Sequence, residues 1–184
     1  MKRCFSAALL AISALGISQK SADAALSATA TISAQQVSAN SYTYSMTLTN
    51  NGDTNIGTFW FAWFPAYDLL PTAPTAIGSP AGWTGVNAPD IFGVASAQWV
   101  NTTTPLQPNH SLSGFTFTTS DSPATLAGTS FFSVPIMESY VYIGAPETDP
   151  GFALVPAAVA APEPGSLMAL VGAPLALLTR RRRR

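Results

Sequence analysis

The alternation of apolar and polar residues between positions 41 and 49 constrains the fold of this chain more than any other feature. Four apolar residues alternate there with serine and threonine: Tyr42, Tyr44, Met46 and Leu48. A period of two places all four side chains on one face of a β-strand. The next four residues, NNGD at 50–53, are of the types that accept turn conformations. We therefore expect a half-buried strand that ends in a turn.

The remaining apolar segments predict further short strands. Residues 56–64 are apolar on both faces of such a strand, and Pro65 ends it. Other expected strands are residues 25–37, 92–100, 111–119 (with Gly114 as a candidate β-bulge), 129–134 and 139–143. Outside the two ends, no long segment has the 3.6-residue period of a helix. Short antiparallel strands separated by glycine and proline turns predict an all-β fold, an antiparallel β-sandwich.

The basic residues lie only at the two ends of the chain. Residues 21–179 contain no lysine or arginine, whereas residues 25–161 contain seven aspartates and glutamates. Such a segment offers no basic side chain to phosphate or nucleic acid, so the sequence excludes a nucleic-acid partner.

Residues 1–24 have the three parts of a secretory signal peptide. Lys2 and Arg3 precede an apolar run, and Ala22 and Ala24 fit the small-x-small rule for cleavage after Ala24. A membrane-anchoring first helix is the alternative. Cys4 is the only cysteine and would leave with the signal, so the exported part would have no disulfide and no cysteine metal site.

Residues 156–184 form an expected linker and membrane-engaging tail. The apolar helix expected at 165–179 would span about 22 Å at ~1.5 Å per residue, against a hydrocarbon core of about 30 Å. The arginines after it would stay cytoplasmic under the positive-inside rule. The tail therefore predicts a short transmembrane helix, held transiently in the inner membrane, with residues 25–155 exported as one domain.

The order of these tail elements resembles a PEP-CTERM sorting signal. Its parts are Pro162, Glu163 and Pro164, the short apolar helix, and a terminal cluster of Arg180, Arg181, Arg182, Arg183 and Arg184. The resemblance implies a Gram-negative exosortase as the processing partner, delivery to the cell surface or extracellular matrix, and a link to exopolysaccharide or biofilm. An ordinary tail anchor is the alternative, and it leaves the Pro-Glu-Pro motif unexplained.

Three stretches of the exported domain resemble bacterial immunoglobulin-like modules. They are YSMTLTNNGD, the pair Gly82-Trp83, and PLQPNHSLSGFTFTT. The resemblance implies an immunoglobulin-like β-sandwich. The segment FWFAWFPAYD at 59–68 is also similar to a stretch of exported PEP-CTERM proteins whose role is unassigned.

No residue pattern predicts a catalytic or metal site. His110 is the only histidine, and the sequence has no Gly-x-Ser-x-Gly nucleophile elbow whose serine it could activate as a base. Four acids leave a carboxylate-based hydrolase open: Asp68, Asp90, Asp121 and Glu138. Glu147 and Asp149 read as a solvated turn rather than a calcium loop. We expect a non-enzymatic protein without cofactors or bound metal.

Aromatic residues give the one candidate ligand site. Trp60, Trp63 and Trp83 are the candidates for stacking on sugar rings, which would make the domain a carbohydrate-binding module; burial in the core is the competing interpretation. Ice binding by the threonine-rich strands is a weaker alternative, because regular threonine ranks need a repeated solenoid.

Overall fold

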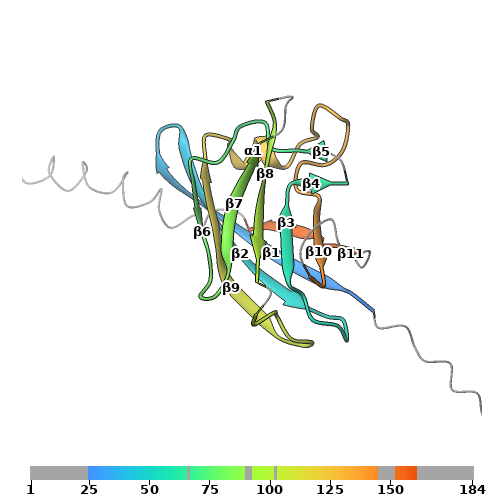
Figure 1. Cartoon of the computed structure of the whole chain (residues 1–184). Helices are drawn as coiled ribbons and strands as arrows, with labels where there is room; N and C mark the ends of the chain where they lie inside the picture. Colours follow the sequence, from blue (N-terminus) through green and yellow to red (C-terminus); the bar gives the residue numbers. More distant parts are fainter. Residues whose placement is uncertain (1–24, 66, 90–92, 102, 145–151, 161–184) are drawn as a thin grey trace, which may run out of the picture.

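The computed structural model describes residues 25–160 except 66, 90–92, 102 and 145–151. Within these residues the chain forms two five-stranded sheets, a two-stranded ribbon and one short helix (Figure 1). The all-β prediction is confirmed. The expected signal helix and tail helix lie outside the described residues, and no helix in the described part is long and apolar enough to cross a membrane.

The first sheet contains the strand predicted from the alternating segment. Its order is β12 (Ala157–Ala160), β1 (Ala28–Ser38), β2 (Ser41–Asn50), β9 (Ser111–Thr119) and β6 (Ala76–Gly78). Neighbours pair antiparallel except β12, which runs parallel to β1. The alternation predicted for β2 is confirmed, because Tyr44, Met46 and Leu48 are buried while Ser45 is exposed.

The second sheet is antiparallel throughout. Its order is β11 (Phe152–Leu154), β10 (Ser139–Tyr142), β3 (Thr58–Phe61), β8 (Ala95–Val100) and β7 (Thr84–Pro89). The chain leaves β2 through the turn at 50–53 and enters the other sheet at β3. The helix α1 (Pro123–Leu126) is a single turn, capped by the Ser122 hydroxyl.

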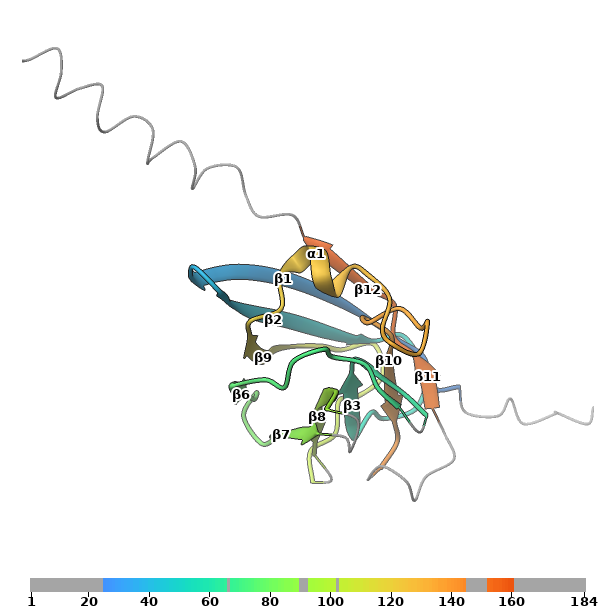
Figure 2. The same cartoon turned by 90° about the horizontal axis from the view of Figure 1, so that it is seen from above.

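The two sheets pack against each other in layers (Figure 2). Aromatic rings bridge them: Phe61 of β3 lies 5.1 Å from Phe117 of β9, and Phe59 lies 5.4 Å from Phe115, measured between centroids. All four rings are buried. One shared apolar core therefore holds the layers together, as in the predicted sandwich; the immunoglobulin-like assignment stays a prediction.

Two predicted strands are wrong in detail. The strand at 56–64 is broken at Ala62, whose φ of 55° lies in the left-handed region. Trp63 and Phe64 instead form β4 (Trp63–Phe64), which pairs with β5 (Tyr67–Asp68). Residues 129–134 form no strand: the Ser130 amide donates to the Val134 carbonyl, so the segment closes into a turn.

The folded part extends beyond the boundary placed at residue 155. β12 adds Ala157–Ala160 to the edge of the first sheet, in a segment assigned to a linker. Alternation gives no signal there, because residues 157–160 are three alanines and one valine. The Pro-Glu-Pro motif therefore follows the sheet directly.

Candidate functional site

The break at Ala62 determines where Trp63 lies. In an unbroken strand Trp63 would share the face of Phe59 and Phe61, which point into the shared core. The positive φ of Ala62 turns the chain, and Trp63 stacks on Trp60 with centroids 4.1 Å apart and an angle of 8° between the rings. Trp63 thus joins the face of the second sheet that points away from the core.

Eight aromatic residues form a continuous series of ring contacts, which we call the aromatic strip. Its members are Trp60, Trp63, Phe64, Tyr67, Phe131, Phe132, Tyr140 and Tyr142. Trp63 and Phe64 both contact Tyr140, at 5.6 and 6.1 Å between centroids. Phe64 then contacts Tyr67 at 6.4 Å. The rings form one series of contacts from β3 to the turn after α1.

The strip passes from buried to exposed along its length. Trp60, Tyr140 and Tyr142 are buried, and Trp63 and Phe64 are half-buried. Tyr67 is 39% exposed and lies 4.5 Å from Phe132, which contacts Phe131 at 5.4 Å. The Phe131 ring is 87% exposed. The open end of the strip therefore offers aromatic faces to solvent, while the other end fixes them to the sheet.

Polar groups hold the buried end in place. The Trp60 Nε1 donates to the Ser96 Oγ at 2.6 Å, and the Tyr140 hydroxyl donates to the Glu138 Oε1 at 3.3 Å. Burial first, and then the charge and hydrogen bond of Glu138, raise the pKa of Tyr140 to about 12. Tyr140 therefore stays a neutral donor at physiological pH.

Two of the four candidate carboxylates lie beside the strip. Asp68 is the register partner of Trp63 in the β4–β5 ribbon, and the Glu138 carbonyl accepts the Trp63 amide at 3.0 Å. Trp63 is thus flanked by an acidic residue on each side. Asp90 lies outside the described residues.

Asp121 has a structural role elsewhere in the fold. Its carboxylate accepts from the Thr72 amide at 3.1 Å and the Thr119 hydroxyl at 3.3 Å, and its carbonyl accepts from the Tyr44 hydroxyl at 2.8 Å. Burial, followed by the charge of Asp121, raises the pKa of Tyr44 well above its usual value. Asp121 is buried and fastens a turn to β2.

Trp83 and His110 are not part of the strip. Trp83 is buried in the shared core, with its ring 5.2 Å from Phe115 in an edge-on arrangement. Of the three candidate stacking tryptophans, the structure therefore places Trp60 and Trp63 together and Trp83 apart. His110 is exposed in a turn, where its Nδ1 lies 2.8 Å from the Pro108 carbonyl.

No metal site forms among the described residues. In the ranges that the structure describes, no group of three or more histidine, cysteine or acidic side chains converges. Glu147 and Asp149 lie outside those ranges.

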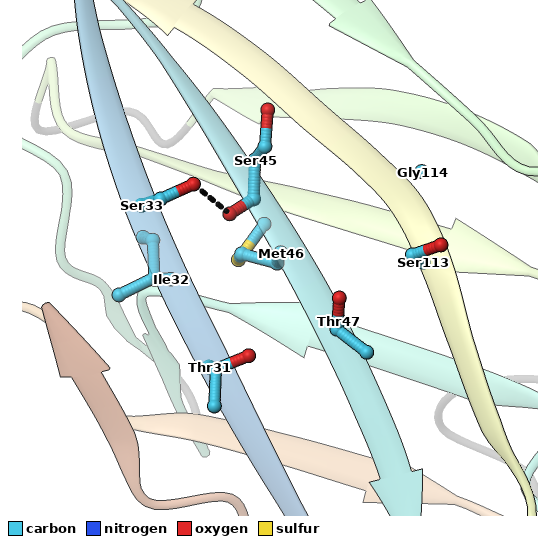
Figure 3. Close-up of a pocket in the computed structure, with 8 residues that line it drawn as sticks. All are labelled: Thr31, Ile32, Ser33, Ser45, Met46, Thr47, Ser113 and Gly114. Atoms are coloured by element: carbon cyan, nitrogen blue, oxygen red, sulfur yellow. Dashed lines mark hydrogen bonds between the residues drawn. The ribbon is translucent and has the colours of Figure 1, made fainter. Parts of the chain in front are cut away.

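The outer face of the first sheet carries hydroxyls instead of rings. Thr31, Thr47 and Ser113 stand opposite one another across β1, β2 and β9. These three residues line a shallow pocket of about 180 Å³ (Figure 3), together with Ile32, Ser33, Ser45, Met46 and Gly114. Gly114, with φ of 102°, is the predicted bulge: the register shifts there, which interrupts the hydroxyl rows on β9.

Sequence reasoning missed half of the strip. Phe131 and Phe132 were assigned to a strand, and the tyrosines of β10 were not connected with Trp63. The available signal was a pair of adjacent phenylalanines in a segment without alternation; the structure leaves Phe131 exposed and Phe132 half-buried.

Comparisons with known proteins give little further guidance. No protein-family model matches the chain, and no curated protein matches it. Two solved structures of the GH20 exo-β-N-acetylglucosaminidase from Vibrio harveyi, one in complex with N-acetylglucosamine and one of an inactive mutant, align with TM-scores of 0.43 and 0.44. The identities are 13% and 14%, over 74% of this chain. The chain spans only 19% of the enzyme's length, and a likeness at this level assigns it no activity.

Proposed function

We propose that this chain is an exported, non-enzymatic protein of the cell surface or extracellular matrix, sorted through a C-terminal PEP-CTERM signal that an exosortase processes. The support is in the sequence: a signal-like start, Pro-Glu-Pro at 162–164, a short apolar run and a terminal arginine cluster. The domain to be exported, which we propose is an immunoglobulin-like sandwich, contains no lysine or arginine, so the basic residues flank it at both ends as the positive-inside rule expects for cytoplasmic segments.

We further propose that the aromatic strip is a polysaccharide-contact surface of this domain. The observation that carries this proposal is the unbroken series of ring contacts ending at Phe131, which is 87% exposed. Tyr67, Phe132 and Phe131 are contiguous through their ring contacts, and contiguous exposed apolar side chains are typical of interaction surfaces. Aromatic faces stack on the apolar faces of sugar rings, and the exopolysaccharide habitat implied by the tail supplies such a ligand.

The sorting proposal is tested by deleting residues 162–184. In a host with an exosortase, the full chain reaches the cell surface or medium and loses its tail, whereas the truncated chain has a different location. The same pair in a host lacking the exosortase is the control. Mass spectrometry of the mature C-terminus locates the cut. Identical localisation of the two chains in the exosortase host would contradict the proposal.

The binding proposal is tested by retention on insoluble cellulose, chitin and agarose. Phe131→Ser and Tyr67→Ser remove the two exposed rings, and Val37→Ser, at a 54% exposed site on the β1–β2 hairpin, is the matched control. We expect wild type and the control to be retained on at least one matrix, and the double variant to bind at least about tenfold more weakly, since covering a large apolar side chain contributes up to ~1.5–3 kcal/mol. Equal retention of all three chains, or none on any matrix, contradicts the proposal.

The hydrolase alternative is separated from binding by the acids beside Trp63. The proposed non-enzymatic function predicts that incubation with each matrix releases no reducing ends. It also predicts that Asp68→Asn combined with Glu138→Gln keeps most of the retention. Release of reducing ends by wild type and its loss in this variant would establish the hydrolase instead.

A further inference from the structure

The first residues of the described domain are hydrogen-bonded to the turn between β2 and β3. The backbone amide of Ala25 donates to the Asp53 Oδ1 at 2.5 Å, and the Asp53 amide donates back to the Ala25 carbonyl at 3.1 Å. The Ser27 carbonyl accepts two further amides, from Asn51 at 2.9 Å and Gly52 at 3.0 Å. Four hydrogen bonds thus fasten the start of the chain to one turn.

Gly52 makes this close approach possible. A Cβ atom at this position would lie 2.2 Å from the Ala25 carbonyl oxygen and 2.8 Å from the Ser27 nitrogen, both of them backbone atoms. No side chain larger than hydrogen fits at position 52, because the backbone of the turn packs directly against the backbone of residues 25–27.

The residue held by Asp53 is also the first residue after the expected signal cleavage site. Hydrolysis of the Ala24–Ala25 peptide bond by a signal peptidase consumes one water and leaves a carboxylate on Ala24 and an ammonium on Ala25. An α-amino group has an ordinary pKa of about 7.7–8.0, so it is mostly charged at neutral pH. After cleavage, a cation would stand where an amide N–H now meets a carboxylate.

We propose that Asp53 is the receptor for the mature α-ammonium group, so that signal removal converts an amide–carboxylate hydrogen bond into an ion pair that holds the start of the exported domain. The inference rests on the proposed export. Asp53 has no lysine or arginine partner in residues 21–179, and its other described donor is the Thr54 hydroxyl at 3.2 Å. The new terminus thus supplies Asp53 with a cation that no lysine or arginine of residues 21–179 can supply. A charge on the donor as well as the acceptor adds Coulomb attraction to the hydrogen bond that Asp53 already accepts.

The composition provides a direct probe. Lys2 and Lys20 are the only lysines, and both precede the cleavage site. The α-amino group of Ala25 is therefore the single primary amine of the processed chain. Acetyl-N-hydroxysuccinimide neutralises it without changing the sequence, and hydroxylamine reverses any ester formed on tyrosine. Ala25 and Asp53 are both exposed, so the reagent reaches them.

The experiment uses the full chain, exported by a Gram-negative host and purified with its signal removed. Mass spectrometry first identifies the mature N-terminus, which is expected at Ala25. The thermal midpoint is then measured before and after acetylation, for wild type and for Asp53→Asn. Acetylation is expected to lower the midpoint of wild type by about 1–3 °C, as for an exposed ion pair, and to leave that of Asp53→Asn unchanged.

The rate of acetylation gives a second readout. An ammonium held by a carboxylate is a poor nucleophile, so Asp53→Asn is expected to react at least about twofold faster than wild type at pH 7. If Asp53→Asn does not fold, acetylation of wild type alone still tests the proposal. An unchanged thermal midpoint of wild type after acetylation overturns it. Equal shifts in both chains also overturn it.

The same sample separates this proposal from the sorting proposal. A mature chain that begins at a residue other than Ala25 overturns only the role of Asp53. A chain that begins at Ala25 and keeps its tail in the presence of an exosortase contradicts only the sorting.

Discussion

The indole rings of Trp60 and Trp63 are nearly parallel and in contact, although Phe61 and Ala62 separate the two residues in the chain. In a regular strand, residues at this spacing of three point to opposite faces. The left-handed conformation of Ala62 removes that opposition and joins the buried end of the aromatic strip to its exposed part.

Loss of the Trp63 ring is predicted to destabilise the domain and change its optical spectrum. Trp63→Ala removes ring contacts with Trp60, Tyr140 and Tyr142, and because Trp63 is half-buried we expect a loss of about 2 kcal/mol, less than for a fully buried tryptophan. Denaturant unfolding and near-ultraviolet circular dichroism measure both effects. Trp63→Phe keeps a ring and should lose less than half as much; an equal loss would show that stacking is not the cause.

The bulge on β9 is predicted to require glycine. Gly114→Ala forces a side chain into a backbone with φ of 102°, which costs about 1–3 kcal/mol. The space itself is open, because the nearest atom to the new Cβ, in Pro80, lies 3.7 Å away. The neighbouring Ser113→Ala is the control and should change the free energy of unfolding by less than about 0.5 kcal/mol. Similar values for the two variants would contradict a conformational cause.

The buried carboxylate of Asp121 is predicted to stabilise its turn. Asp121→Ala leaves the Thr72 amide and the Thr119 hydroxyl without their acceptor, which should cost about 1–3 kcal/mol in denaturant unfolding. Tyr44→Phe removes only a hydroxyl donor to the Asp121 carbonyl and should cost about 1 kcal/mol. If Asp121→Ala unfolds at the wild-type midpoint, these hydrogen bonds do not stabilise the fold.

Stability is predicted to fall in alkaline solution because of Tyr140. Its pKa is raised to about 12, whereas an unfolded tyrosine ionises near 10. Between these values the unfolded chain binds fewer protons, so the contribution of Tyr140 is complete below pH 10 and is lost as the pH rises through 12. Residues 21–179 contain no lysine to titrate in the same window, but Tyr44, whose pKa is also raised by burial, adds to the same fall. Tyr140→Phe should flatten the fall of the unfolding midpoint above pH 10, and an unchanged slope would exclude Tyr140 as its source.

The strands with clear alternation were predictable, and the irregular segments were not. β2 and β9 were found because one of their faces is apolar and the other carries hydroxyls, a pattern that burial of one sheet face imposes directly. The short strands β6, β11 and β12 have three or four residues each, too few for alternation to be distinct from chance.

The aromatic strip was half predictable for a related reason. Trp60 and Trp63 are predicted as candidates because they are large aromatic residues. Their position on one face depends on the φ of Ala62, and an alanine in the sequence does not predict a left-handed conformation. The sequence indicates Trp83 as a candidate for sugar stacking on the same grounds as Trp63, but the structure places Trp83 in the shared core. Which aromatic residue is exposed depends on the packing of two sheets, which local sequence does not contain.

The parallel pairing of β12 with β1 determines how the domain responds to mechanical force. Ala157–Ala160 run alongside Ala30, Thr31, Ile32 and Ser33 in the same direction, and the tail leaves from the far end of β12. A pull on that tail acts along the strand, so the hydrogen bonds of this ladder bear the load together in shear and do not open one after another. A domain tethered by its C-terminus and dragged by flow would therefore load this strand pair in shear.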